Sequence, residues 1–189
     1  AIIAVPASVV PKVLKECVGK KVKGVIVISG GFSETGAKGK KLEEEVKRII
    51  KNSNTRLMGV NCLGVYDPST NVDTIFNPRE RLSRPSSGSI GFVSQSGAVG
   101  VTILDWLAEE QIGISKFISY ENATDINECD CVEYLGEDKK TEGKEKRCCS
   151  GSQLSETRDI PGCGFHRRFL WAEQKSHADK GGFHSFLRC

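Results

Sequence analysis

The chain has 189 residues, of which 38% are hydrophobic, and its 27 basic and 24 acidic side chains leave a formal net charge of +3. So small an excess of positive charge argues against a dedicated nucleic-acid-binding protein. The sequence has no run of about 18 apolar residues that could cross a membrane, and it opens on AIIAVP, without an initiator methionine or the basic segment of a signal peptide. We therefore expect a cytoplasmic protein whose sequence starts as if cut from a longer one.

The composition changes near Thr141. Valine and isoleucine occur 29 times before residue 142 and only once after it, whereas all three histidines and four of the eight cysteines lie in residues 142–189. Because these β-branched residues favour strands, a continuous α/β domain should not lose them so abruptly. The sequence therefore predicts a globular body over residues 1–141 and an irregular tail after it, for which out-of-frame translation is the leading hypothesis.

The first half of the body alternates between strands and helices. Apolar runs typical of buried parallel strands lie at residues 2–5, 24–28 and 56–60, and helical periodicity lies at residues 8–18 and 40–51. We expect Ser8 to cap the first helix, with Pro11 in its first turn. This order of elements predicts a doubly wound α/β domain with right-handed crossovers.

Residues 65–87 are polar and rich in turn formers. We expect them to form an irregular connection between two units, with Arg79, Arg81 and Arg84 in solvent. A second α/β unit then follows, with strands expected at 89–93 and 117–119 and helices at 99–111 and 125–135. The last of these helices carries Cys129 and Cys131 two residues apart, so the two thiols cannot share one face. This unit ends before it is complete.

Two loops in the body have the composition of ligand-binding turns. Ser29-Gly30-Gly31 and Ser94-Gln95-Ser96-Gly97-Ala98 each follow a strand and precede a helix, at the edge where open α/β sheets bind ligands. Glycine lets the backbone approach a ligand, and free amides at a helix start favour anions. The alternative is that both are tight turns that only cap their helices, because neither contains a Walker sequence or a complete dinucleotide fingerprint.

The order of five sequence blocks is more specific than either loop alone. VPASVV, VIVISGGFSETG, LMGVNCLGV, RPSSGSIGFVSQSGAVG and SYENATDI follow one another in an order that resembles the NDP-forming acyl-CoA synthetases. This family includes the ADP-forming acetate–CoA ligases and is similar to the succinyl-CoA synthetase α subunit. The resemblance covers residues 1–141.

The resemblance implies an α/β fold in three parts. Residues 1–84 would form a truncated Rossmann-like CoA-binding domain that lacks its first strand and its phosphate loop. Residues 85–141 would form the start of a flavodoxin-like succinyl-CoA-ligase domain. Residues 142–189 would form an atypical, irregular tail.

The family pattern also implies site residues. Contacts to coenzyme A are implied for Pro6, Ser8, Ile28, Ser29, Gly30, Asn61 and Cys62. The SxSGA turn implies a phosphoryl group held at a helix start by Ser94, Ser96, Gly97 and Ala98, in agreement with the helix dipole. Two positions depart from the family. Val60 replaces the proline of GPNCLG, and Glu121 replaces a glycine, where an inward-pointing carboxylate would repel phosphate or a carboxylate substrate.

The implied reaction is reversible, and in it a small carboxylic acid, coenzyme A and ATP give acyl-CoA, ADP and phosphate. An acyl phosphate forms, a histidine carries the phosphoryl group, and an ATP-grasp partner binds the nucleotide with Mg, either as a β subunit or as a fused domain. Imidazole suits this relay because it is both nucleophile and leaving group near neutral pH. We expect the intact protein to be an oligomer and to bind neither nucleic acid nor a membrane.

No residue matches the phosphohistidine of the family, because the strands that should precede His177 are missing. The chain alone is therefore expected to be an inactive part of the ligase. Two other functions stay open: a regulatory CoA-binding module of a protein acetyltransferase, and a catalytically inactive CoA-binding fragment.

The tail offers a zinc site as an alternative to irregular chain. Its possible ligands are Cys148, Cys149, Cys163, His166, His177 and His184. Adjacent cysteines and a Cys-x2-His spacing do not give the paired geometry of structural zinc sites, so no metal site is assigned.

Overall fold

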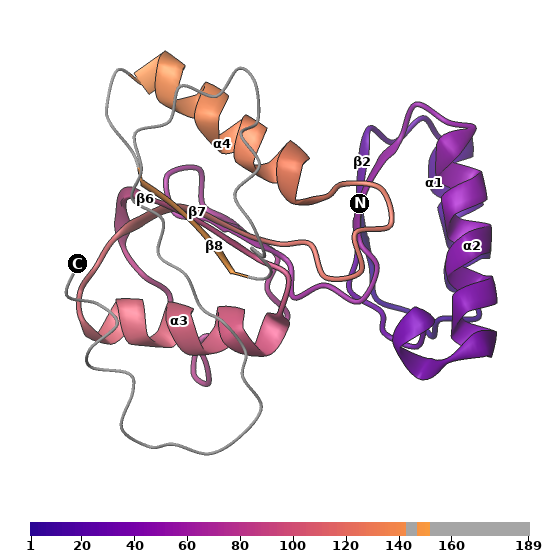
Figure 1. Ribbon diagram of the computed structural model, residues 1–189, viewed down its shortest axis with the longest axis horizontal. Coiled ribbons are helices and arrows are strands. Elements are labelled where there is room, and N and C mark those ends of the chain that lie inside the picture. The colour runs from indigo at the N-terminus through magenta and orange to yellow at the C-terminus, as the bar shows by residue number, and fades with distance from the viewer. Residues whose placement is uncertain (143–146, 152–189) are drawn as a thin grey trace, which may run out of the picture.

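The computed structural model describes residues 1–142 and 147–151, which form two α/β units (Figure 1). The first unit contains β1 (Ile2–Ile3), α1 (Val10–Gly19), β2 (Gly24–Val27), the 3-10 helix η1 (Ser33–Thr35), α2 (Ala37–Lys51) and β3 (Arg56–Gly59). The second contains β4 (Val65–Asp67), β5 (Val72–Asp73), β6 (Ser87–Ser94), α3 (Gly97–Glu109), β7 (Ile114–Ser119), α4 (Glu128–Glu142) and β8 (Arg147–Gly151). The predicted α/β class is confirmed.

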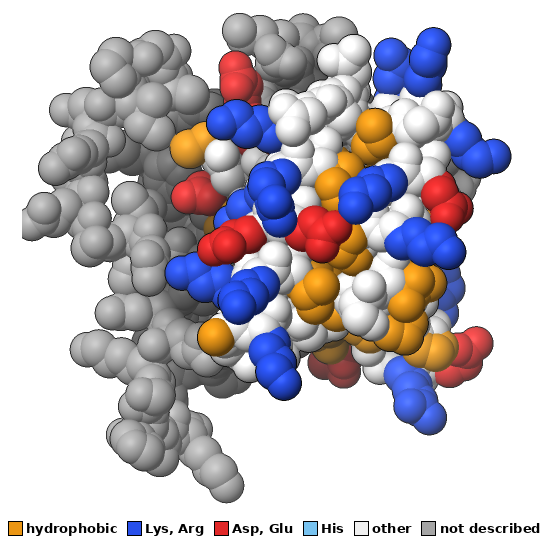
Figure 2. Space-filling view, turned by 90° about the vertical axis from the view of Figure 1, so that its right-hand side faces the viewer, with side chains coloured by type: hydrophobic (Ala, Val, Ile, Leu, Met, Phe, Trp, Pro, Cys, Tyr) orange, Lys and Arg blue, Asp and Glu red, His pale blue; other side chains and the backbone are white. Residues whose placement is uncertain are grey.

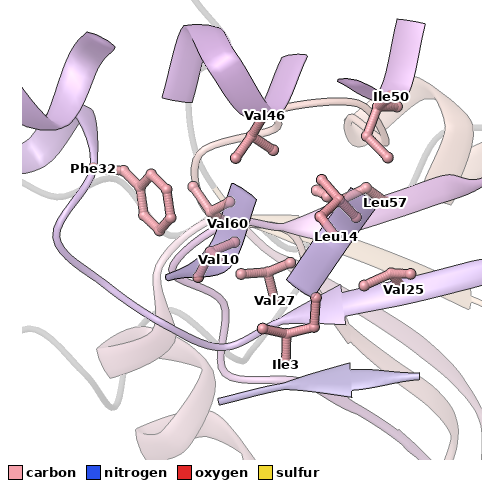
Figure 3. Packing of buried hydrophobic residues seen from close by; sticks show 10 residues of the cluster. All are labelled: Ile3, Val10, Leu14, Val25, Val27, Phe32, Val46, Ile50, Leu57 and Val60. Carbon is pink, nitrogen blue, oxygen red and sulfur yellow. The ribbon is translucent and has the colours of Figure 1, made fainter. Parts of the chain in front are cut away.

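The first unit is a parallel sheet in the order β1-β2-β3, with α1 and α2 on the same face (Figure 1). Both helices lie on one side because two successive right-handed crossovers advance in the same direction. Figure 3 shows the core between this face and the helices, where Val27 and Leu57 pack with Leu14 and Val46. Side chains alternate along a strand, so Ile2 points to the other face and is 54% exposed.

Helix α1 begins two residues later than predicted, and Ser8 does not cap it. Val9 takes the capping position and makes no side-chain hydrogen bond. The N–H groups of Val9 and Val10 instead donate to the carbonyls of Pro6 and Ala7, at 2.8 and 3.2 Å. Backbone turns therefore start this helix, with the predicted proline in its first turn.

Basic side chains predominate on the outer face of α1 and α2 (Figure 2). Residues 12–51 contain 11 basic and 5 acidic side chains, more than the excess of the whole chain. The Lys15 ammonium contacts the Glu45 carboxylate between the two helices, with Nζ and Oε1 2.9 Å apart. Such a charged outer face, opposite an apolar inner face, is what fixes how an amphipathic helix lies on its sheet.

The second unit is a mixed sheet in the order β5-β4-β7-β6-β8, with α3 and α4 on opposite faces (Figure 1). Leu104 of α3 packs in one core with Phe117, and Leu135 of α4 packs in another with Val93. Strands β6 and β7 are parallel, as the crossover through α3 requires. Their carboxyl ends point to the first unit.

The segment 65–87 is irregular over most of its length, as predicted, but it also contains two short strands. It forms β4 and β5, and Val65 of β4 pairs antiparallel with Ile118 of β7. These strands join the second sheet although the sequence analysis assigned them to the first domain. The pattern could not reveal this, because the strand that they pair with lies far along the chain.

The side chain of Arg84 is buried, whereas the sequence predicted it to lie in solvent. Its side chain is 3% exposed, and its Nε donates to Asp73 at 3.0 Å. The other guanidinium nitrogens donate to the carbonyls of Leu82 and Asn77 at 2.7 and 2.8 Å. The guanidinium therefore ties β5 to the chain that leads into β6.

A short part of the predicted irregular tail is a strand. Strand β8 lies parallel to β6, with Arg147 opposite Ile90. Its pairing depends on backbone groups along the open edge of β6, so it needs no strand-forming side chains. Residues 152–189 lie outside the described part of the chain.

The loop after β7 pairs with the edge of the first sheet and joins the two units. The N–H groups of Thr124 and Ile126 donate to the carbonyls of Gly59 and Leu57, at 2.9 and 3.1 Å. The Asp125 carboxylate accepts from Leu57 N–H at 2.7 Å and lies 3.0 Å from the Arg56 guanidinium. An edge strand presents unpaired backbone groups, and here the second unit satisfies those of β3.

Candidate functional site

A pocket of about 390 Å³ lies where the two units meet. The ends of β2, β3, β6 and β7 and the chain after β5 contribute its walls. Its lining residues are Ile28, Asn61, Cys62, Leu63, Phe76, Asn77, Ser96, Gly97, Ala98, Val101 and Glu121. The pocket thus brings together three of the residues predicted to contact coenzyme A and three of those predicted to hold a phosphoryl group.

The other predicted coenzyme A residues lie at the same edge of the first sheet. Ser29 Oγ accepts from Val5 N–H at 3.1 Å and joins the ends of β1 and β2. A Cβ at Gly30 would lie 2.7 Å from Asn61 Oδ1, so only glycine allows Asn61 this position. Pro6 and Ser8 are exposed and follow β1.

An internal carboxylate already occupies the glycine loop after β2. Glu34 Oε1 accepts from the N–H groups of Gly31 and Phe32, at 2.5 and 3.0 Å. Burial opposes ionisation of Glu34, but these two hydrogen bonds and one from Asn122 outweigh it and lower the pKa of this carboxyl. The amides of this loop, which the sequence predicted as a possible site for an external anion, therefore donate to a carboxylate of the same chain.

The two serines of the turn from Ser94 to Ala98 have different roles. Ser94 is fully buried, and its hydroxyl donates to Ser96 O at 2.8 Å and accepts from Ser96 N–H at 3.2 Å. This hydroxyl therefore shapes the turn and does not line the pocket. Ser96 caps α3, where its Oγ accepts from Val99 N–H at 3.4 Å, and it lines the pocket together with Gly97 and Ala98.

Glu121 points into the pocket. In this orientation its carboxylate would repel a phosphate group, as the sequence analysis noted. Its carboxylate accepts from Gly97 N–H at the start of α3, and Ser119 Oγ lies 3.3 Å from its Oε1. Burial and the charge of Glu34 raise the pKa of Glu121, although the hydrogen bonds from Ser119 and Gly97 oppose the rise. Its backbone φ of +47° is in the left-handed region, where glycine is favoured.

Cys62 is a structural thiol. It is 1% exposed, and its Sγ lies 3.4 Å from Val27 O. Burial, together with the charge of Glu121, raises the pKa of Cys62 to about 12. Because the thiolate is the nucleophile, this cysteine is protonated and unreactive at neutral pH.

Val60 makes a contact that a proline could not make. It is fully buried in the first core, and its N–H donates to Thr124 Oγ1 at 3.2 Å. Proline has no N–H to donate. The departure from the family pattern at this position therefore adds a bond between the units.

Phe76 and Asn77 lie in the wall of the pocket, where the sequence pattern did not predict them. Phe76 is 60% exposed, and Asn77 Oδ1 is a buried acceptor without a hydrogen-bond partner among the described residues. The only signal at this point was the Asn-Pro pair at residues 77–78, which marks a turn. Nothing in the local pattern indicated that this turn would reach the ends of β3 and β6.

Cysteines, as possible metal ligands, lie both in the body and in the tail of the chain. Cys129 is exposed and Cys131 is buried, so the two thiols lie on different faces of α4, as predicted. Among residues 1–142 and 147–151, no group of three or more His, Cys, Asp or Glu side chains could hold a metal ion. The zinc alternative rests on Cys148 and Cys149, of which only the backbone is described, and on residues of the segment 152–189, which lies outside the described part. No helix of the described chain is long and apolar enough to cross a membrane.

Two family models match the chain. The model of the CoA binding domain matches residues 1–68, and the model of the succinyl-CoA ligase like flavodoxin domain matches residues 87–143. The acetate–CoA ligase [ADP-forming] of Methanocaldococcus jannaschii is 43% identical over 141 residues, which are 75% of this chain and 19% of that protein. The acetate–CoA ligase [ADP-forming] II subunit alpha of Pyrococcus furiosus is 40% identical over 137 residues, which are 72% of this chain and 29% of that subunit.

Solved structures give the same picture. A protein of Pyrococcus horikoshii has a TM-score of 0.71 and 34% identity, over 82% of this chain and 33% of its own. The dinucleotide forming acetyl-coenzyme A synthetase 1 of Ca. Korarchaeum cryptofilum, in complex with phosphate and ADP, has a TM-score of 0.68 and 29% identity, over 86% of this chain and 32% of its own. The chain therefore spans about a fifth to a third of these proteins.

Proposed function

We propose that this chain is a segment of an acid–CoA ligase of the NDP-forming acyl-CoA synthetase family, because two family models match residues 1–68 and 87–143 and an ADP-forming acetate–CoA ligase aligns with 75% of the chain. The whole ligase would convert a small carboxylic acid, coenzyme A and ATP into acyl-CoA, ADP and phosphate. One observation carries the proposal: a single pocket is lined by predicted coenzyme A residues of one unit and predicted phosphoryl residues of the other. Transfer of an acyl group from phosphate to a thiol needs the two reactants held side by side.

The first unit would bind coenzyme A near its thiol. Ile28, Asn61 and Cys62 line the pocket, and Pro6, Ser8, Ser29 and Gly30 would contact the cofactor along the same edge of the sheet. The amides of Gly31 and Phe32 already bond Glu34. We therefore assign this loop to the uncharged part of coenzyme A and not to its phosphates.

The second unit would hold the phosphoryl group at the start of α3. Ser96 Oγ and the amides of Gly97 and Ala98 are the groups assigned to this role, and Ser94 maintains the turn that presents them. Donors fixed in advance stabilise the charge that develops during phosphoryl transfer.

The remaining machinery would come from outside the described residues. Residues 1–151 contain no histidine, so the chain by itself is proposed to be inactive. The Pyrococcus furiosus relative is a subunit alpha, which supports a partner that carries the nucleotide site. That partner would be an ATP-grasp subunit or fused domain that binds ATP with Mg, in an oligomeric enzyme.

The division of the chain at residues 84 and 141 is part of this proposal. Residues 1–84 would be the CoA-binding unit by sequence, 85–141 the beginning of the ligase-like unit, and 142–189 a separate tail. Segment 65–84 belongs to the first by sequence and to the second by strand pairing.

A CoA-binding module without catalysis is the second candidate. One observation favours it: the Glu121 carboxylate accepts from Gly97 N–H, an amide that would otherwise hold the phosphoryl group. Such a module would serve either as a regulatory part of a protein acetyltransferase or as an inactive fragment.

Calorimetric titration of coenzyme A into the full chain tests the proposal. We expect binding by the unmodified chain and at least about tenfold weaker binding by the Asn61→Asp variant, equivalent to roughly 1.4 kcal/mol. A carboxylate at this position would lose its water when the uncharged part of the cofactor covers it, and aspartate tolerates the φ of +61° at residue 61 as asparagine does.

Asn52→Asp is the matched control, because it makes the same change of charge at an exposed position at the end of α2. No binding by the unmodified chain would contradict the coenzyme A assignment. Formation of acetyl-CoA from acetate, ATP and coenzyme A by the chain alone would contradict the proposal that the chain by itself is inactive.

A further inference from the structure

Glu121 lies where the proposed function would bind a phosphoryl group. Gly97 N–H donates to its carboxylate, and a Cβ placed on Gly97 would lie only 2.6 Å from Glu121 Oε1. Ser96 and Ala98, which flank Gly97, line the same pocket as Glu121. The side chain therefore presents a carboxylate to the start of a helix of 13 residues, the end of a helix that attracts anions.

From this geometry we infer that Glu121 is a tethered anion that competes with a phosphoryl group for the amides at the start of α3. The inference rests on the proposed phosphoryl site. One amide N–H cannot donate in full to two oxygens, and two anions at one helix start repel each other. An oxyanion can enter only when the carboxylate turns away or takes up a proton.

Within the part of the chain that the structure describes, no positive charge beside Glu121 would offset this repulsion. Among the described residues that line the pocket, none is basic, and the first turn of α3 contains no charged side chain. The other titratable groups that face Glu121 are Glu34 of η1 and the Cys62 thiol. Neither assists an oxyanion, since Glu34 is itself an anion and Cys62 is neutral.

Competition by a tethered group reduces affinity by a calculable factor. The apparent dissociation constant equals the intrinsic constant divided by the fraction of molecules in which the site is open. A carboxylate that occupies the amide nine-tenths of the time would weaken anion binding about tenfold. Glu121 therefore determines both the affinity of the site and the pH at which it fills.

The pH dependence has a definite sign. Protonation of Glu121 removes its charge, so anion affinity should rise as the pH falls through the titration of this carboxyl. The pKa of Glu34 is lowered and that of Cys62 is about 12, so these two groups titrate on either side of Glu121. A single transition between them is expected.

Sulfate is the probe for this inference, because its charge stays constant in the range where carboxyl groups titrate. Calorimetry on the full chain is expected to give at least about tenfold tighter sulfate binding at neutral pH for Glu121→Gln than for the unmodified protein. Glu121→Gly should bind at least as tightly, and it also removes a side chain from a left-handed backbone position. Glu109→Gln, at the exposed far end of α3, makes the same change of charge and should leave sulfate affinity unchanged.

Nuclear magnetic resonance of the Gly97 amide provides a readout that does not depend on added anions. Its chemical shift should follow pH in the unmodified protein and lose this transition in Glu121→Gln. Equal sulfate affinity in the unmodified protein and both Glu121 variants, all folded by circular dichroism, would overturn the inference alone. If none of the three bound sulfate, the proposed phosphoryl site would fail as well.

Discussion

Three glutamates near the pocket ionise under different conditions, because their neighbours differ. Glu34 receives two backbone N–H groups, and Glu43 of α2 receives Ser33 N–H at 3.2 Å, Asn122 Nδ2 at 3.0 Å and, on its other oxygen, Lys47 Nζ at 3.1 Å. Burial opposes ionisation of Glu43, but these hydrogen bonds outweigh it and lower its pKa, whereas the pKa of Glu121 is raised. Hydrogen bonds to the charged form, and not burial alone, separate the first two from the third.

Glu43→Gln should lower the free energy of unfolding by about 1–3 kcal/mol, because it weakens three hydrogen bonds to a residue that is 5% exposed. Urea denaturation at neutral pH measures this loss. Glu44→Gln, one position along α2 and exposed, is the control and should change stability little. Equal losses in the free energy of unfolding for the two variants would show that the hydrogen bonds of Glu43 do not stabilise the protein.

The same substitution should change the response of the protein to acid. The pKa of Glu43 in the folded protein is below the ordinary value of 4.5. Its contribution to stability is therefore complete above that value and is lost as the pH falls towards the folded pKa. Stability of Glu43→Gln should fall less steeply in this range than that of the unmodified protein, and urea midpoints at a series of acidic pH values would record the difference.

At the scale of elements, apolar runs and glycine turns could be predicted and long-range pairing could not. The strands around Val25, Leu57 and Phe92 follow from unbroken apolar runs. Strand β6 has helices on both faces of its sheet and needs no alternation, whereas β2 and β3 have helices on one face and alternate in burial. The sequence predicts the start of α4 at residue 125, but the helix begins at Glu128. There Asn127 Oδ1 accepts from the N–H of Asp130, whose carboxylate accepts from Asn127 N–H, a reciprocal pair that spacing alone could have revealed.

The candidate site divides in the same way. The turns at Gly30 and Ser96 were recognisable because their composition is local. Bonding of Glu34 to its loop and of Glu121 to α3 depends on how distant elements pack, as does the approach of Phe76 to the pocket. Comparison with the family pattern indicates only that a carboxylate at residue 121 is unusual.

Asp125 joins the loop after β7 to the edge strand β3. Asp125→Ala would leave Leu57 N–H and the Arg56 guanidinium without this acceptor, and we expect a loss of about 1–3 kcal/mol in the free energy of unfolding. Glu133→Ala, an exposed carboxylate on α4, is the control. Thermal or urea unfolding that cannot distinguish the two variants would show that this contact contributes nothing.

At the scale of the whole molecule, the pocket belongs to both units, so a ligand should stabilise both. Binding to the folded state alone raises stability in proportion to the logarithm of ligand concentration. We expect coenzyme A to slow amide hydrogen exchange in residues 59–64 of the first unit and in residues 94–101 of the second. Mass spectrometry of peptides with and without coenzyme A tests this, with the exposed outer turns of α1 as the internal control. Protection confined to the first unit would contradict a shared pocket.

The pairing of the loop after β7 with β3 also limits how such a protein can be recombined. The CoA-binding sequence ends near residue 68 by the family model and near 84 by the division that the resemblance implies, yet the backbone partners of Leu57 and Gly59 lie at residues 124–126. A chimera joined between these points would inherit a sheet edge from one parent and its covering loop from the other. The smallest portion that can be exchanged between relatives without a mismatch at this contact therefore runs from the first strand through residue 126. The two units have to be exchanged together.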